Sequence, residues 1–237
     1  MSDDTLQAPG EAELLHDATQ RLVRTVDGIT SEAWPGPSLL PGWSRAHVVA
    51  HLTLNAEGLA GVLGGIVQDQ PVPMYASQEQ RDADIEKLAA AGPSVLRTRF
   101  LGATTELTDA MAAMPEDAWD TVVERVPGGR TFPASAVPGM RLGEVEIHHV
   151  DLACGPTHAD WPPLFGVLVL DAAGGRGVVR QPFRAHATDL DRTWSFGDGG
   201  GPTVSGTVVD LAWWLTGRGN GEGVTSDDGE LPGIEEW

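Results

Sequence analysis

Apolar residues recur at steps of three and four along the first two-thirds of the chain, which is the spacing of amphipathic helices. The clearest apolar stripe lies within residues 11–27 and includes Leu14, Ala18, Leu22 and Val26. Capping residues and prolines mark the starts of further helices. These helices are predicted over residues 45–67, 78–91, 93–114 and 141–153. Together the segments predict a bundle of four or five helices with short connections.

Two short stretches between the last two of these helices have a different pattern. Residues 121–126 and 130–132 flank a Pro-Gly-Gly turn at 127–129, which predicts a hairpin or an irregular excursion. The composition changes again near Gly155-Pro156. We therefore expect two domains, a helical one over residues 1–157 and a smaller one over residues 158–237.

The second domain has the pattern of a small α+β unit. It combines predicted helices with short segments rich in β-branched and aromatic residues, and a glycine-rich turn lies between them. The helices are predicted at 164–173 and 207–215, the strands at 183–188 and 193–196, and the turn at 197–201. The acidic tail after Asn220 is expected to be ordered only in part.

The charge balance limits the partners that the protein can have. Of 237 residues, 15 are Lys or Arg and 34 are Asp or Glu, so the formal charge is −19. Such a chain repels phosphate backbones and anionic lipid, which argues against nucleic-acid and membrane partners. No apolar run approaches the ~20 residues of a membrane helix. The single cysteine, Cys154, excludes an intrachain disulfide. We expect a cytoplasmic protein that is a monomer or a weak oligomer.

Two histidine pairs inside predicted helices are the first candidates for chemistry. His47 and His51 are four residues apart in the helix at 45–67, and Asn55 continues the same face. In the helix at 141–153, Glu144 and His148 have the same spacing.

The pattern alone equally permits Glu146 and His149 as the inward-facing pair of the second helix. Two imidazoles and one carboxylate suit Zn²⁺ or another divalent ion and leave one coordination position open. The alternative is a structural bundle in which these histidines only form hydrogen bonds. Three arginines near predicted helix ends, Arg81, Arg141 and Arg218, are candidates for binding carboxylates. The alternative for each arginine is a surface charge or a structural ion pair.

Four stretches together resemble one known family. They are the Pro-Gly-Trp-Ser-Arg…His-Leu run at 41–52, the Met-Tyr-Ala-Ser and Arg-Asp pattern within 74–86, the Glu…His-His…Asp run at 143–152, and Trp-Leu-Thr-Gly-Arg at 214–218. In this order they resemble the mycothiol-dependent maleylpyruvate isomerases, within the DinB-like group of metal-dependent thiol transferases. The Met-Tyr-x-Ser pattern indicates the isomerase branch. The resemblance implies a DinB-like four-helix bundle followed by a sterol-carrier-like α+β domain.

The resemblance also assigns roles to individual residues. It implies metal ligands at His51, Glu144 and His148, with Zn²⁺ or another divalent ion and mycothiol as cofactors. It implies a small dicarboxylate substrate held by Arg81 and Arg218. His47 and Asn55, on the ligand face, are expected in the cofactor site as partners that orient His51.

The sequence departs from the family pattern at three positions beside the implied ligands. Gly143 stands where family members often have Arg, Glu146 where Trp is common, and His149 where a small residue is common. A carboxylate at 146 that faced the site would change the charge at the metal or the preferred substrate.

The reaction implied by the resemblance is a cis–trans isomerisation in gentisate-type aromatic degradation. A metal-activated mycothiol thiolate would add to maleylpyruvate, the resulting single bond would rotate, and elimination would give fumarylpyruvate. Two alternatives remain open at this point. One is a mycothiol S-transferase that acts on other electrophiles, and the other is a non-catalytic zinc-binding regulator.

Overall fold

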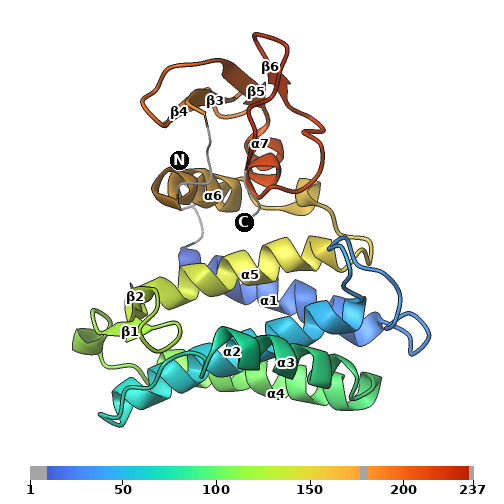
Figure 1. The fold of residues 1–237 in the computed structure, drawn as a ribbon, viewed down its shortest axis with the longest axis vertical. Helices are drawn as coiled ribbons and strands as arrows, with labels where there is room; N and C mark the ends of the chain where they lie inside the picture. The colour runs from blue at the N-terminus through green and yellow to red at the C-terminus, as the bar shows by residue number, and fades with distance from the viewer. Residues whose placement is uncertain (1–9, 177–180, 235–237) are drawn as a thin grey trace, which may run out of the picture. The chain divides into compact units, whose positions relative to one another are not determined.

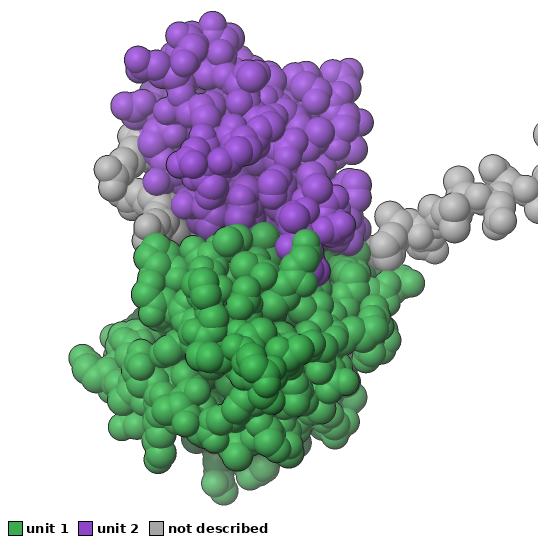
Figure 2. Space-filling view, turned by 90° about the vertical axis from the view of Figure 1, so that its right-hand side faces the viewer, with its two compact units in different colours: residues 1–155 green, residues 156–237 purple. Residues whose placement is uncertain are grey.

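The computed structural model describes residues 10–176 and 181–234. The chain divides into two units, Met1–Gly155 and Pro156–Trp237, which Figure 2 colours separately. The division lies two residues before the boundary predicted from composition.

The first unit is built from five α-helices, two short strands and two 3₁₀ turns in its described part. In chain order these are α1 (Glu11–Gly28), α2 (Arg45–Val67), α3 (Gln78–Ala89), α4 (Pro93–Ala112), η1 (Glu116–Ala118), β1 (Val122–Glu124), β2 (Thr131–Pro133), η2 (Ala134–Ala136) and α5 (Val137–Asp151). In the bundle, α2 packs on α4 and α1 packs on α5, while the shorter α3 lies along α2 (Figure 1).

The helix boundaries follow from local capping chemistry. The Ser44 hydroxyl accepts a hydrogen bond from the backbone N–H of His47 at the start of α2, and Ser77 caps α3 in the same way. The predicted start of α5 at residue 141 is wrong, because the helix begins at Val137. The prediction treated Pro138 as a break, but proline is tolerated in the first helical turn.

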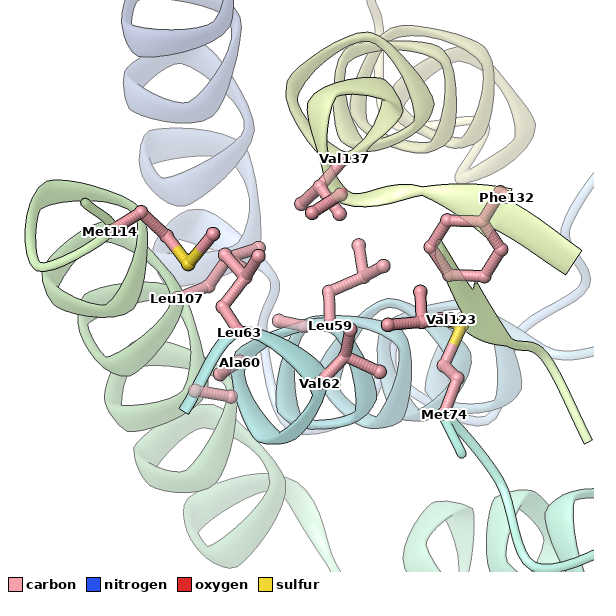
Figure 3. Packing of buried hydrophobic residues seen from close by; sticks show 13 residues of the cluster. Leu59, Ala60, Val62, Leu63, Met74, Leu107, Met114, Val123, Phe132 and Val137 are labelled. Atoms are coloured by element: carbon pink, nitrogen blue, oxygen red, sulfur yellow. The ribbon is translucent and has the colours of Figure 1, made fainter. Parts of the chain in front are cut away.

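The hairpin of β1 and β2 closes one end of the bundle core. Val123 and Phe132 point from the two strands toward Leu59 of α2 (Figure 3). The backbone N–H groups of Met74 and Tyr75 each donate to a carbonyl of the segment that contains β1 and its turn, both over 2.9 Å. These two bonds hold the segment that leads into α3, so the hairpin helps to position that helix.

The second unit is a four-stranded sheet with two α-helices. Its described elements are η3 (His158–Asp160), α6 (Pro163–Arg176), β3 (Phe183–Ala187), β4 (Arg192–Phe196), β5 (Thr203–Gly206), α7 (Val208–Leu215) and β6 (Thr225–Ser226). The strand order is β4-β3-β5-β6, in which β3 and β5 are parallel and the other neighbouring pairs are antiparallel.

The pattern of the sequence did not predict β5 or β6. Because β6 pairs with β5, the segment after Asn220 is tied to the sheet. The predicted fold class, a helical bundle followed by a small α+β unit, is confirmed. Within residues 10–176 and 181–234, none of the helices has the length and apolar character needed to cross a membrane.

Candidate metal centre

Three side chains from α2 and α5 converge inside the first unit. Nε2 of His51 lies 2.8 Å from Oε2 of Glu144 and 3.1 Å from Nε2 of His148. The third side of this triangle, from His148 Nε2 to Glu144 Oε2, measures 3.3 Å. In the described part of the chain, this is the group of His, Cys, Asp and Glu side chains with the geometry to hold a metal ion.

The size and chemistry of this donor triangle fit a divalent ion. Donors about 2.0–2.1 Å from a tetrahedral ion lie about 3.3 Å from one another, close to the separations observed. A set of two imidazoles and one carboxylate is the ligand type of catalytic zinc sites, which keep one position open. The side chain of His51 is 6% exposed, that of His148 13% and that of Glu144 29%, so the cluster is sheltered and still reachable.

Asp151 fixes the orientation of one imidazole. Its Oδ2 atom lies 2.8 Å from Nδ1 of His148, and the Asp151 side chain is fully buried. A carboxylate accepts, so His148 carries its hydrogen on Nδ1 and directs the lone pair of Nε2 into the triangle. Metal-binding histidines commonly have a carboxylate partner of this kind.

Arg81 of α3 contacts the other imidazole. Its Nη2 donates to Nδ1 of His51 over 3.0 Å, and its Nη1 donates to the carboxylate of Asp82 over 2.8 Å. Its guanidinium carbon also lies 5.7 Å from the centre of the Tyr75 ring, within the range of a cation–π contact. A fixed positive charge therefore stands beside the donor triangle.

Burial and neighbouring charges shift the pKa values of the cluster in opposite directions. Burial lowers the pKa of His51, because the charged imidazolium loses its hydration. Burial also opposes the charged form of His148, but hydrogen bonds and charges from Asp151 and Glu144 outweigh it and raise that pKa. Burial would raise the pKa of Glu144, yet the two histidines hold it well below its usual value. The carboxylate is thus kept ionised for a cation.

The structure gives His47 and Asn55 other contacts than those predicted. The ring of His47 bonds to Ser44 at the start of α2, and its Nε2 lies 3.2 Å from a carboxylate oxygen of Glu86. The side-chain oxygen of Asn55 accepts from Nη1 of Arg141 over 2.8 Å. Nδ1 of His51 is contacted by Arg81 rather than by either of these residues.

Arg141 is a buried structural cation. It is 2% exposed and also donates to the carbonyl of Leu52 over 2.8 Å. Burial lowers its pKa to about 10, so the guanidinium stays charged at neutral pH. It joins α5 to α2 one helical turn from the donor triangle.

The two unusual residues beside the ligands face α1. Glu146 forms an ion pair with Arg21, and Nε2 of His149 lies 2.7 Å from the hydroxyl of Thr25. The choice between the two histidine–carboxylate pairs is therefore resolved in favour of Glu144 and His148. Arg218, the remaining predicted site residue, lies just after α7 in the second unit, where its Nη1 donates to the carbonyl of Thr216 over 3.1 Å. Its role in the site stays a prediction.

The bundle and its donor triangle define a helical protein with a candidate metal centre between two of its helices. The sequence profile described as the mycothiol maleylpyruvate isomerase N-terminal domain matches residues 15–153, and the chain belongs to this family. A crystal structure of a mycothiol-dependent maleylpyruvate isomerase is 28% identical with a TM-score of 0.88, over 96% of this chain and 95% of that one.

A second crystal structure, of a variant of such an isomerase with one histidine replaced by alanine, has a TM-score of 0.87 at the same identity and coverage. A comparison with curated proteins found no match. The resemblance stated from the sequence is confirmed, and it identifies a family of mycothiol-dependent enzymes.

Three residues without a predicted role, Asp151, Tyr75 and Trp43, lie beside the centre. Asp151 follows His148 by three residues, a spacing that places both on one helix face and is a usable signal. Tyr75 lies beneath Arg81, and its pKa is raised first by burial and then by the charge of Glu144. The ring of Trp43 lies 5.7 Å from the ring of His51, edge to face. No sequence spacing predicts the last two contacts.

Proposed function

We propose that this chain converts maleylpyruvate to fumarylpyruvate with mycothiol and a divalent metal ion as cofactors. The family and the two solved relatives support the reaction class. The observation that carries the proposal is the position of His51. One ring nitrogen belongs to the donor triangle, and the other lies 3.0 Å from the guanidinium of Arg81. The proposed metal ligands and the arginine proposed for a substrate carboxylate thus meet at one residue.

When bound, the metal would keep the mycothiol sulfur as a thiolate, whose reversible addition to the cis double bond permits rotation. The protein must then hold a substrate with two carboxylates inside a chain of charge −19. Arg81 is proposed for one carboxylate, as a charge-assisted hydrogen-bond donor beside the triangle. Arg218 is proposed for the other carboxylate. Arg81 also supplies positive charge near the enolate that the addition creates.

Neighbouring residues set the protonation states of the side chains in the triangle. Asp151 keeps the Nδ1 hydrogen of His148 and thereby leaves its Nε2 free to coordinate. Glu144 stays ionised, because the two imidazoles lower its pKa. The site has one negative ligand, so a divalent ion retains a net charge of about +1 for binding an anionic sulfur.

The test uses metal-loaded protein, mycothiol and maleylpyruvate, with the vinyl protons of the product followed by ¹H NMR. We expect conversion to the trans isomer, and we expect His51→Ala to lose bound metal and conversion together. His16→Ala, which removes an exposed histidine of α1, is the matched control and should behave as the unchanged protein. Full conversion by metal-free His51→Ala would contradict the proposal.

An assay with the same metal-loaded protein distinguishes an isomerase from an S-transferase. An uncharged electrophile is offered with mycothiol in parallel with maleylpyruvate. An S-transferase would accumulate the conjugate and leave maleylpyruvate unchanged, whereas the proposed isomerase consumes no thiol. A regulator would bind metal and perform neither reaction.

A further inference from the structure

A cavity lies in the first unit, where α2 begins and α3 ends. Its volume is about 600 Å³, which is within the ~300–1,000 Å³ typical of small-molecule sites. Its lining includes Trp34, Ser44, His47, Glu86, Ala89 and Pro93. None of these residues belongs to the donor triangle.

The cavity adjoins the candidate metal centre through shared elements. His47, which lines the cavity, precedes His51 by one turn of α2, a rise of about 6 Å. The Trp43 ring bridges them, with its centre 6.3 Å from the ring of His47 and 5.7 Å from that of His51. On the facing helix α3, Arg81 contacts His51 and Glu86 contacts His47. The cavity and the donor triangle are therefore close enough for the two ends of one elongated ligand.

The polar groups of the cavity suit hydroxyl groups rather than anions. The indole N–H of Trp34 is buried and has no hydrogen-bond partner among the residues that the structure describes. Buried donors are normally satisfied, so an acceptor group of a ligand would satisfy this N–H once the side chains that cover it move aside. Glu86 adds a carboxylate at the wall, which accepts hydrogen bonds from hydroxyls and repels a carboxylate substrate. The alanines and the proline supply apolar surface between these groups.

We propose that this cavity holds the hydroxylated sugar–inositol part of the thiol cofactor while its sulfur reaches the donor triangle. The inference rests on the proposed function in so far as the thiol and the metal share one site. It gives His47 and Glu86 a part in recognising the cofactor. It also explains why the acidic Glu86 is compatible with a site whose substrate is a dianion, because the two ligands occupy different places.

The first test fills the cavity and measures binding directly. Mycothiol and N-acetylcysteine, which has a cysteine thiol but no sugar or inositol, are titrated calorimetrically into metal-loaded protein. We expect the unchanged protein to bind mycothiol at least about tenfold more tightly. Ala89→Trp should abolish this preference and leave metal content and N-acetylcysteine binding unchanged. Ala83→Trp, at an exposed position of α3 outside the cavity lining, is the matched control and should retain the preference.

The second test removes one donor and keeps the ring. Trp34→Phe should weaken mycothiol binding by about 3- to 10-fold, the effect of one hydrogen bond, and leave N-acetylcysteine binding unchanged. If the indole N–H had only a structural role, Trp34→Phe would change the binding of both thiols or of neither.

The inference is overturned if the unchanged protein fails to prefer mycothiol, or if Ala89→Trp binds it normally. Failure of the proposed function looks different. In that case mycothiol binds with the expected dependence on residues 34 and 89, but maleylpyruvate is not converted.

Discussion

Nη2 of Arg81 lies 3.0 Å from Nδ1 of His51, while Nε2 of the same ring faces Glu144 at 2.8 Å. An arginine side chain only donates, so Nδ1 must accept and a neutral ring carries its hydrogen on Nε2. A metal ligand instead needs the lone pair of Nε2, which moves the hydrogen to Nδ1, where it faces the guanidinium. The contact therefore holds His51 in the tautomer that competes with metal binding.

This relationship predicts opposite effects of Arg81→Ala on metal and substrate. Metal should bind about three- to tenfold more tightly, because the competing contact is gone. The KM for maleylpyruvate should rise about 10- to 100-fold, because one charge-assisted carboxylate contact is lost. Chelator competition measures the first quantity and steady-state kinetics the second.

Arg125→Ala is the control for Arg81, since the guanidinium carbon of Arg125 lies 5.4 Å from the centre of the same Tyr75 ring. It should change the metal affinity by less than about twofold. Metal binding that weakens in Arg81→Ala would show that the guanidinium supports the ligand instead of competing with it.

Asp151→Ala should weaken metal binding although it removes none of the three proposed ligands. The carboxylate accepts from Nδ1 of His148 over 2.8 Å, and losing such a partner typically lowers metal affinity by about 10- to 100-fold. Asp151→Asn should have a smaller effect, because its amide oxygen can still accept. The measurement is metal affinity at equal folded fraction, judged by circular dichroism. Equal losses of metal affinity in both variants would show that the negative charge of Asp151, rather than its hydrogen bond, supports metal binding.

The helical part of the fold was predictable because its signals are local. The Ser44 and Ser77 caps and the apolar spacing along α1 lie within a few residues of the elements they define. The β5 and β6 strands were missed because β6 is only two residues long and depends on pairing with β5. The start of α5 was missed because the same Pro138 can end one segment or begin a helix.

The candidate site, like the fold, was predictable only where its signals are local. Four-residue spacing placed His51, Glu144 and His148 on helix faces, but only the packing of α1 on α5 shows that Glu146 and His149 face Arg21 and Thr25. Similarly, the helix face shared by His51 and Asn55 did not reveal that Asn55 pairs with Arg141 across the bundle. The spacing of residues along a helix shows which of them share a helix face. The residues that they contact are set by the tertiary packing.

Asn55→Ala should destabilise the first unit more than it disturbs the metal. The substitution removes an acceptor from Arg141, which is 2% exposed and stays charged because its pKa is about 10. Leaving a buried charge with one fewer partner costs about 2–4 kcal/mol. Urea unfolding measures this loss, and metal stoichiometry per folded protein should remain unchanged. Asn220→Ala, at an exposed position, is the control. A stable variant that lost mycothiol affinity would restore the predicted cofactor role of Asn55.

Glu146 should make the free energy of unfolding depend on pH. Burial raises its pKa from 4.5 to about 7, despite the neighbouring charge of Arg21. Between these two pH values the folded protein holds a proton that the unfolded chain has released, so stability falls as the pH rises toward 7 and then levels off. Glu146→Gln has no proton to release. From pH 5.5 to 8 the variant should therefore gain about 2 kcal/mol relative to the unchanged protein.

Urea unfolding of both proteins with chelator present, followed by tryptophan fluorescence, measures this difference without a contribution from bound metal. Glu13→Gln makes the same chemical change at an exposed position of α1 and should leave the pH dependence as it is. Parallel pH profiles for Glu146→Gln and the unchanged protein would mean that the Glu146 carboxyl is ionised throughout this range. In that case the ion pair with Arg21 would outweigh the burial of Glu146, and the polar contact between α1 and α5 would stabilise the bundle at neutral pH.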